Sequence, residues 1–188
     1  MFKFTGSLVL SLSLAIALAG VMIIGGRIWS SAFRSTLNFD RHGMVQPPTV
    51  QDFIDQVREE FPQVPAVQVD QLQKLLESQE EVILVDVRTD QEQAVSMIPG
   101  AIAPEQLSMQ LEQSPEATVI AYCTIGYRSA QYVQQLQEQG ISALNLEGSL
   151  LSWIEHQGPL EHEGEATNRV HVYGKRWSIV PEGYVPVY

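Results

Sequence analysis

The sequence contains a single cysteine, Cys123, among 188 residues. One cysteine forms no intramolecular disulfide, so the chain is not a small secreted domain held together by disulfide bridges. No cluster of cysteine and histidine has the spacing of a metal site, and we therefore expect no metal and no cofactor. The four histidines are instead expected to be solvated or hydrogen-bonded; they are His42, His156, His162 and His171.

Basic residues are also scarce, with 11 Lys and Arg against 22 Asp and Glu, which gives a formal net charge of −11. Between residues 65 and 162 only Lys74, Arg88 and Arg128 are basic, against fourteen acidic residues. Such a region repels phosphate groups, which argues against a nucleic-acid partner. With 45% hydrophobic residues, the chain has enough apolar side chains for a packed core.

Charge is absent from residues 5–26, an apolar stretch of 22 residues. About 20 apolar residues suffice for a helix to cross a bilayer, so we predict a single-pass transmembrane anchor within residues 1–28. The small residues of Ala17-Leu18-Ala19 leave a cleaved signal peptide as the alternative. Cleavage there would leave an apolar stub on the mature chain, which favours the anchor.

Three arginines follow the apolar stretch, whereas Lys3 stands alone before it. The positive-inside rule therefore predicts that the bulk of the protein lies on the cytoplasmic side, with an exported domain as the alternative. The three arginines are Arg27, Arg34 and Arg41.

The remaining sequence divides into four segments. Residues 29–49 are polar and broken by proline, as in a linker, and residues 50–62 have the apolar spacing of an amphipathic helix. We expect this helix to dock on the domain that follows, over residues 63–162, although a separate partner helix is an alternative. Residues 163–188 are rich in aromatic residues, glycine and proline, and are expected to form an extended tail.

Short apolar runs alternate with helical patterns in the predicted domain. Residues 82–87, 118–122 and 142–146 read as buried strands. One helix is expected to begin at Asp70 as its N-cap, and another to run from near Ser129 to Gly140. This alternation predicts an α/β fold in three layers, with a central parallel sheet covered on both faces.

Cys123 directly follows the predicted strand 118–122 and precedes a predicted helix. Ligands of open α/β sheets collect at the carboxyl ends of strands. The connecting loop must curl, and Gly126 tolerates the positive φ that this requires. A curled loop turns backbone N–H groups inward and forms an anion-binding nest, which would lower the pKa of the Cys123 thiol. An inert, buried cysteine is the alternative.

Four motifs in order resemble the rhodanese family over residues 64–160. The stretch YCTIGYRS contains Cys123 and resembles the family's active-site loop. The other three are ILVDVR at residues 83–88, IPGAI at 98–102 and LEGSLLSW at 146–153. The chain departs from the family where Ser96 and Met97 replace Gly-His, and where Ser149 replaces a glycine.

The resemblance implies a membrane-anchored sulfurtransferase in which Cys123 is the nucleophile and carries sulfane sulfur as a persulfide. Its partners would be a small sulfane-sulfur donor, a thiol or cyanide-like acceptor and, as a further option, a protein. Asp86 and Arg88 match a pair expected to support the fold rather than the chemistry. The loop residues expected to bind the anionic substrate are Thr124, Ile125, Gly126, Tyr127, Arg128 and Ser129.

Two other functions compete with sulfur transfer. Cysteine phosphatases share the implied fold, but their loops hold five residues between cysteine and arginine, whereas four lie between Cys123 and Arg128. A non-catalytic, membrane-tethered binding module is the rival from another class. Because the domain is acidic, we also expect thiosulfate, a dianion, to be a poorer donor than a persulfide.

Overall fold

A computed structural model of the protein describes residues 21–24, 27–30, 48–78, 80–172 and 179–188. The chain divides into two units, Met1–Pro48 and Thr49–Tyr188. The elements in chain order are β1 (Val21–Ile24), β2 (Arg27–Ser30), α1 (Val50–Glu60), β3 (Ala66–Val67), α2 (Val69–Glu77), β4 (Val82–Asp86), α3 (Asp90–Gln93), η1 (Pro104–Gln106), α4 (Leu107–Gln113), β5 (Thr118–Tyr122), α5 (Tyr127–Glu138), β6 (Ala143–Leu146), α6 (Ser149–Glu155), β7 (Leu160–His162), β8 (Glu165–Thr167), β9 (Arg169–His171) and β10 (Val185–Val187).

The first unit contains β1 and β2, which pair as an antiparallel hairpin with Ile24 opposite Arg27. Residues 21–24 are therefore a strand, where the sequence predicted part of a membrane helix. Valine and isoleucine favour strands, which explains the difference. The rest of the predicted span, residues 1–20 and 25–26, lies outside the described residues. Among the described residues, no helix combines the length and apolar character needed to cross a bilayer.

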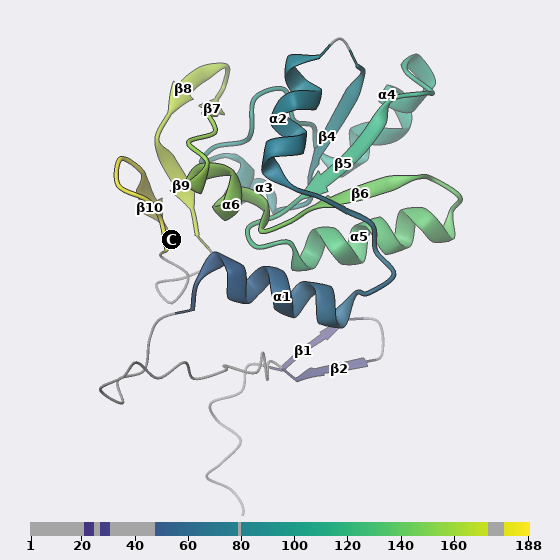
Figure 1. Ribbon diagram of the computed structural model, residues 1–188, viewed down its shortest axis with the longest axis horizontal. Coiled ribbons are helices and arrows are strands. Elements are labelled where there is room, and N and C mark those ends of the chain that lie inside the picture. The colour runs from purple at the N-terminus through teal and green to yellow at the C-terminus, as the bar shows by residue number, and fades with distance from the viewer. Residues whose placement is uncertain (1–20, 25–26, 31–47, 79, 173–178) are drawn as a thin grey trace, which may run out of the picture. The chain divides into compact units, whose positions relative to one another are not determined.

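The second unit is built on a four-stranded parallel sheet in the order β3-β6-β5-β4 (Figure 1). The three predicted strands are its three longest, β4, β5 and β6, and their register brings Asp86 opposite Tyr122. Each consecutive pair of strands is joined through at least one helix, as a parallel sheet requires. The predicted parallel α/β fold is confirmed, and the carboxyl ends of β4 and β5 meet at one edge.

Both faces of the sheet are buried. On one face, alternate residues of β4, β5 and β6 pack with Leu107 of α4 and with Val133 and Leu136 of α5. Side chains of successive strand residues point to opposite faces, and Leu84 and Ile120 on the other face are 3% and 0% exposed. The sheet is therefore the middle of three layers, as the near-continuous apolar sequence of its strands predicted.

The amphipathic helix α1 docks on this unit. Thr49 caps it by accepting a hydrogen bond from the Asp52 backbone N–H, and Val50, Phe53 and Val57 are buried along its apolar face. The helix fits closely against Gly148, where an added Cβ would lie 2.9 Å from a methyl group of Val50. Of the two alternatives, docking on the domain rather than on a separate partner helix is what the structure has.

Two predicted helix starts need correction. Helix α2 begins at Val69 with Gln68 as its N-cap, because the Gln71 side chain accepts a hydrogen bond from the Gln68 backbone N–H. Asp70 therefore lies in the first turn, where its charge still favours the positive end of the helix. Helix α5 begins at Tyr127, earlier than the expected start near Ser129, because Gly126 turns the chain with φ +101°.

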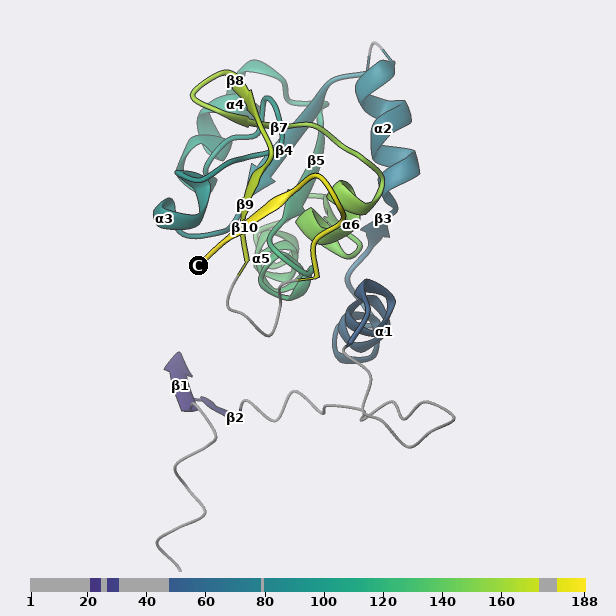
Figure 2. The ribbon, with the colours of Figure 1, turned by 90° about the vertical axis from the view of Figure 1, so that its left-hand side faces the viewer.

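The described part of the C-terminal segment contains three short strands, β8, β9 and β10. Strand β7 pairs antiparallel with β8, and β9 pairs parallel with β10 (Figure 2). Val170 and Val172 are fully buried. Because strand side chains alternate, this burial holds His171 between them in a fixed orientation.

Candidate active site

Cys123 lies at the carboxyl end of β5, directly before the loop that leads into α5. The left-handed conformation of Gly126 starts the helix abruptly, so that Arg128 and Ser129 occupy its first turn. An added Cβ at Gly126 would meet backbone atoms at 3.6 Å, and the positive φ alone favours glycine there. The fold thus places the helix N-terminus beside the sulfur atom, and this position favours negative charge.

Two donors point at the sulfur. The Gly126 backbone N–H donates to Cys123 Sγ over 3.2 Å, and the Ser129 hydroxyl donates to it over 3.6 Å. The Cys123 residue is only 1% exposed. Burial raises the pKa of the Cys123 thiol, but the Arg128 charge and the hydrogen bonds from Ser129 and Gly126 outweigh it, and the net shift is downward. The arrangement therefore favours a thiolate.

Helix α6 holds the cysteine loop through hydrogen bonds to the loop backbone. The Leu150 N–H donates to the Cys123 carbonyl and the Leu151 N–H to the Thr124 carbonyl, each over 3.1 Å. The Cys123 N–H donates in turn to Ser149 Oγ over 3.1 Å. Both polar groups of the Cys123 backbone are thus bonded to α6, which fixes the direction in which the side chain leaves the loop.

Arg128 forms a two-pronged ion pair with Glu92 of α3. Its Nη1 and Nη2 atoms lie 2.7 Å and 2.8 Å from the two carboxylate oxygens of Glu92. Nη2 also donates to Thr124 Oγ1 over 3.2 Å. Burial disfavours the cation, but the Glu92 carboxylate outweighs it and raises the pKa of Arg128. The charge expected to attract an anionic substrate is therefore largely balanced within the protein.

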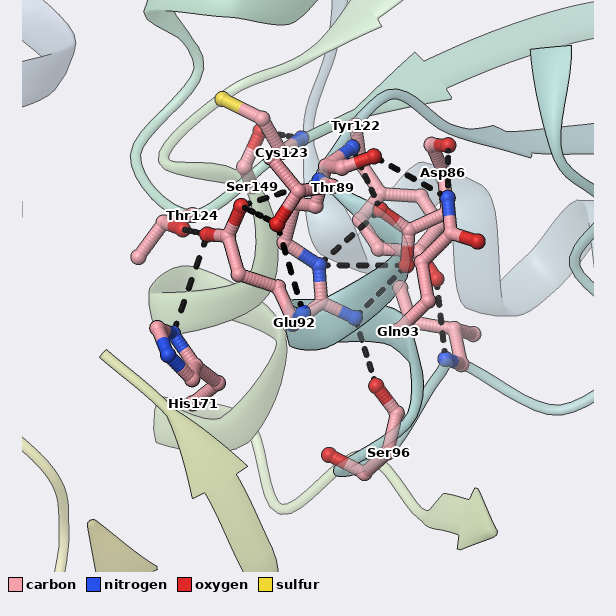
Figure 3. Close-up of polar contacts among 12 residues, drawn as sticks. Asp86, Thr89, Glu92, Gln93, Ser96, Tyr122, Cys123, Thr124, Ser149 and His171 are labelled. Carbon is pink, nitrogen blue, oxygen red and sulfur yellow. Dashed lines mark hydrogen bonds and ion pairs between the residues drawn. The ribbon is translucent and has the colours of Figure 1, made fainter. Parts of the chain in front are cut away.

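Glu92 connects several parts of the site (Figure 3). It completes the cap of α3 by accepting from the Thr89 backbone N–H over 3.0 Å. Burial raises the pKa of Glu92, but the hydrogen bonds from Arg128 and Thr89 outweigh it and lower the value to about 2. The ring of His171 faces the same carboxylate, with Nδ1 3.9 Å from Oε1. The C-terminal strand β9 thus contributes a side chain to this corner.

Asp86 and Arg88 form a second ion pair, with both side chains 0% exposed and a shortest distance of 2.6 Å. Arg88 also donates to the Ser96 carbonyl over 2.6 Å and lies over the Tyr122 ring. The Tyr122 hydroxyl accepts from the Ile98 N–H. The pair thereby joins β4, β5 and the segment before Ile98 beneath the cysteine loop.

The two remaining loop residues of the predicted site are Ile125 and Tyr127. Tyr127 donates its hydroxyl to Glu60 of α1 over 2.6 Å and packs edge-to-face on Phe61. Ile125 is partly exposed. Of the six loop residues named from the sequence, Gly126, Arg128 and Ser129 act on Cys123, whereas Tyr127 secures the loop to α1.

Glu92 and His171 were not predicted from the sequence as part of the site. Glu92 follows Thr89 by three residues, which is the spacing of a capping box. Its role as a helix cap could therefore have been predicted from the sequence, whereas its ion pair with Arg128 could not. His171 lies beyond the predicted domain, and no local pattern indicates its approach to Glu92. Among the described residues, no group of three or more His, Cys, Asp or Glu is arranged to hold a metal ion.

A family model described as a rhodanese-like domain matches residues 68–156. Among curated proteins, the chain is 38% identical over 96 residues to a sulfurtransferase of Allochromatium vinosum; the match spans 47% of this chain and 87% of that protein. A tRNA uridine(34) hydroxylase of Synechococcus elongatus is 36% identical over 92 residues, which span 44% of this chain and only 34% of that protein.

Among solved structures, a thiosulfate sulfurtransferase from Pseudomonas aeruginosa superimposes with a TM-score of 0.50 and 26% identity, covering 60% of this chain and 23% of that one. The regions matched include β4, β5 and the cysteine loop. Helix α1 and strands β7 to β10 lie outside the matched family region.

Proposed function

The chain belongs to the rhodanese-like family, and from that premise we propose that Cys123 accepts a sulfane sulfur atom and carries it as a persulfide. Sulfurtransferases are among its relatives, which supports this class of reaction. The observation that carries the proposal is the pair of donors aimed at the sulfur, the Gly126 N–H and the Ser129 hydroxyl. Because both stabilise negative charge, they favour the thiolate and the persulfide anion alike.

The proposed reaction has two displacements on sulfur. The Cys123 thiolate attacks the outer sulfur of a donor R–S–SH; the donor S–S bond breaks, its electron pair leaves with RS⁻, and Cys123–S–SH forms. An acceptor thiolate or cyanide then attacks that outer sulfur. The new bond forms on the acceptor, and the electron pair of the broken S–S bond returns to Cys123, which is ready to react again.

The Glu92–Arg128 ion pair is an argument for a sulfur donor that carries little negative charge. A free arginine would attract the thiosulfate dianion, but here Glu92 occupies both prongs of the guanidinium. The domain around the site is also acidic. We propose that a persulfide, whether of a small thiol or of a protein cysteine, is a better donor than thiosulfate.

Mass spectrometry tests the carrier role directly. Wild-type protein incubated with glutathione persulfide should gain one sulfur atom on Cys123, and a following addition of cyanide should remove it and release thiocyanate. The variant Cys123→Ser should gain nothing under the same conditions. A wild-type chain that stays unmodified would refute the carrier role.

The variant Glu92→Gln tests the preference for the donor. Removing the carboxylate charge leaves the Arg128 cation unbalanced, so thiocyanate formation from thiosulfate should rise relative to that from the persulfide, chiefly through a lower KM for thiosulfate. Asp90→Asn removes an exposed charge from the same helix and is the matched control. Efficient use of thiosulfate by the wild-type protein at low millimolar concentration would contradict the preference.

One observation favours the rival, a binding module without catalysis. Cys123 is 1% exposed, so a donor reaches its sulfur only if the rim of the site moves. The two functions differ in the persulfide measurement. An unmodified thiol in a chain that binds a partner tightly would favour the module.

We also propose that the uncharged N-terminal sequence attaches the protein to a membrane, with the domain on the cytoplasmic side; residues 21–24, which pair as strand β1, are not counted as part of a spanning helix. This rests on the uncharged sequence and on the arginines that follow it. A tag at the carboxyl terminus, probed with protease in intact cells, tests the orientation. Cleavage of the tag without permeabilisation would mean an exported domain, and recovery of the full chain in the soluble fraction would refute the anchor.

A further inference from the structure

Ser149 has an unusual backbone conformation beside the cysteine loop. Its φ of +50° lies in the left-handed region, which residues other than glycine rarely adopt. It follows Gly148, at φ +64°, so two left-handed residues in a row begin α6. Such strain persists only where surrounding contacts enforce it, and it occurs preferentially at functional sites. The contacts of Ser149 indicate what enforces it here.

The Ser149 hydroxyl is bonded on both sides. It accepts from the Cys123 backbone N–H over 3.1 Å and donates to the Leu146 carbonyl over 3.1 Å. The next residue, Leu150, donates its N–H to the Cys123 carbonyl. Two consecutive residues of α6 thus hold the N–H and the C=O of Cys123, which belong to the two peptide units that flank its Cα. A glycine at position 149 would relieve the strain but would supply no hydroxyl.

The same hydroxyl also lies beside the Ser129 hydroxyl, which bonds to the sulfur. Ser149 Oγ lies 3.4 Å from Ser129 Oγ, and Ser129 Oγ lies 3.6 Å from Cys123 Sγ. Ser129 and Ser149 are both 0% exposed, so no water competes for these hydroxyls at the surface. Ser149 gives its one proton to the Leu146 carbonyl, so its oxygen faces Ser129 as an acceptor, and the Ser129 hydroxyl lies between this oxygen and the sulfur.

We propose that Ser149 is a positioning residue for sulfur transfer, which fixes the backbone of Cys123 and thereby the direction in which its thiolate leaves the loop. This inference rests on the proposed function, because the persulfide would form on the side chain whose direction Ser149 fixes. It explains why a strained serine stands where family members commonly have glycine. Ser149 itself does not touch the reacting sulfur.

Two substitutions separate the hydroxyl from the strain. Ser149→Ala keeps the Cβ at positive φ and removes the hydroxyl, whereas Ser149→Gly removes both. If the hydroxyl positions the thiolate, both variants should slow alkylation of Cys123 by iodoacetamide at neutral pH by about three- to tenfold, corresponding to an apparent thiol pKa raised by about half a unit to one unit. The two should differ only in thermal stability, with Ser149→Ala melting at the lower temperature.

Gln157→Gly is the matched control. Gln157 also has a positive φ, of +57°, but it is exposed and lies after α6. This variant should raise the melting temperature and leave the alkylation rate unchanged. Ser129→Ala, which removes a hydrogen bond to the sulfur itself, should slow alkylation as well.

Alkylation requires no sulfur donor, so the inference and the proposed function fail separately. Normal alkylation in both Ser149 variants, with persulfide formed by the wild type, would overturn the positioning role and leave sulfur transfer standing. Slow alkylation in Ser149→Ala alone would also overturn it, since strain rather than the hydroxyl would then be the cause. Failure of the wild type to form a persulfide would refute the function alone.

Discussion

Two arginine–carboxylate pairs lie near Cys123, and they differ in burial and in what they contact. Both side chains of Asp86–Arg88 are 0% exposed, whereas Arg128 in the pair with Glu92 is 31% exposed. The first pair contacts the Ser96 carbonyl and Tyr122, and the second contacts Thr124 and contributes to the lowered pKa of Cys123. The same chemical pair therefore serves the fold in one place and the sulfur in the other.

Asp86→Ala should have the largest effect on stability. It leaves the Arg88 guanidinium buried and uncompensated, which costs about 3 to 5 kcal/mol of the free energy of unfolding. Urea denaturation measures this, with Asp90→Ala, an exposed aspartate of α3, as the control. A loss below that of the control would mean that the Asp86 pair is dispensable to the fold.

Arg128→Met should have a smaller effect on stability and a larger one on the thiol. Removing the charge that most lowers the pKa of Cys123 should raise the apparent pKa by about one unit and slow alkylation at neutral pH about tenfold. Under conditions where Asp86→Ala stays folded, its thiol should titrate as in the wild type. Equal thiol shifts in the two variants would remove the distinction between the pairs.

Acid should weaken the ion pair between Arg128 and Glu92 by protonating Glu92. Its folded pKa of about 2 lies below the ordinary value of 4.5, so its contribution to stability is complete above the ordinary value and is lost as the pH falls toward the folded one. Between about pH 5 and pH 3 the expected loss is about 2 kcal/mol. Urea denaturation across this range should show the loss in the wild type, and Glu92→Gln should lack that component.

His171→Gln should have the smallest effect. The imidazole lies 3.9 Å from Glu92, a long contact for an ion pair, so the free energy of unfolding should change by less than about 1 kcal/mol. The alkylation rate of Cys123 should stay within about twofold of the wild type. A tenfold change would make the C-terminal strand part of the catalytic apparatus rather than a neighbour of Glu92.

The position of the sulfur site could be predicted from the sequence, but the pairing of Glu92 with Arg128 beside it could not. Strand β5, Cys123 and Gly126 are readable because a buried strand, a nucleophile and a residue tolerant of positive φ follow one another in the chain. Glu92 is 36 residues from Arg128, and only the packing of α3 against the loop brings them together. The helix start at Asp70 was wrong because the backbone N–H groups at the start of α2 found another cap, Gln68 with Gln71.

Two other features could not be predicted from the sequence: the contact of Ser149 with Cys123 and the strand at residues 21–24. The departure from glycine at position 149 is visible in the sequence, but its contact with the Cys123 N–H requires the fold. For residues 21–24 the hydropathy that indicated a membrane helix equally suits a strand, and the structure has a strand. Apolar character alone does not distinguish the two, whereas β-branched residues favour the strand.

Helix α1, which lies outside the matched family region, is bonded at one end to the cysteine loop. Its 11 residues form a rod, which at about 1.5 Å per residue is roughly 16 Å long. One end receives the incoming chain at Thr49, and the other holds the loop through the hydrogen bond between Glu60 and the Tyr127 hydroxyl. Because Tyr127 is the residue next to Gly126, loss of this hydrogen bond would loosen the start of α5 at the point where the Gly126 N–H meets the sulfur.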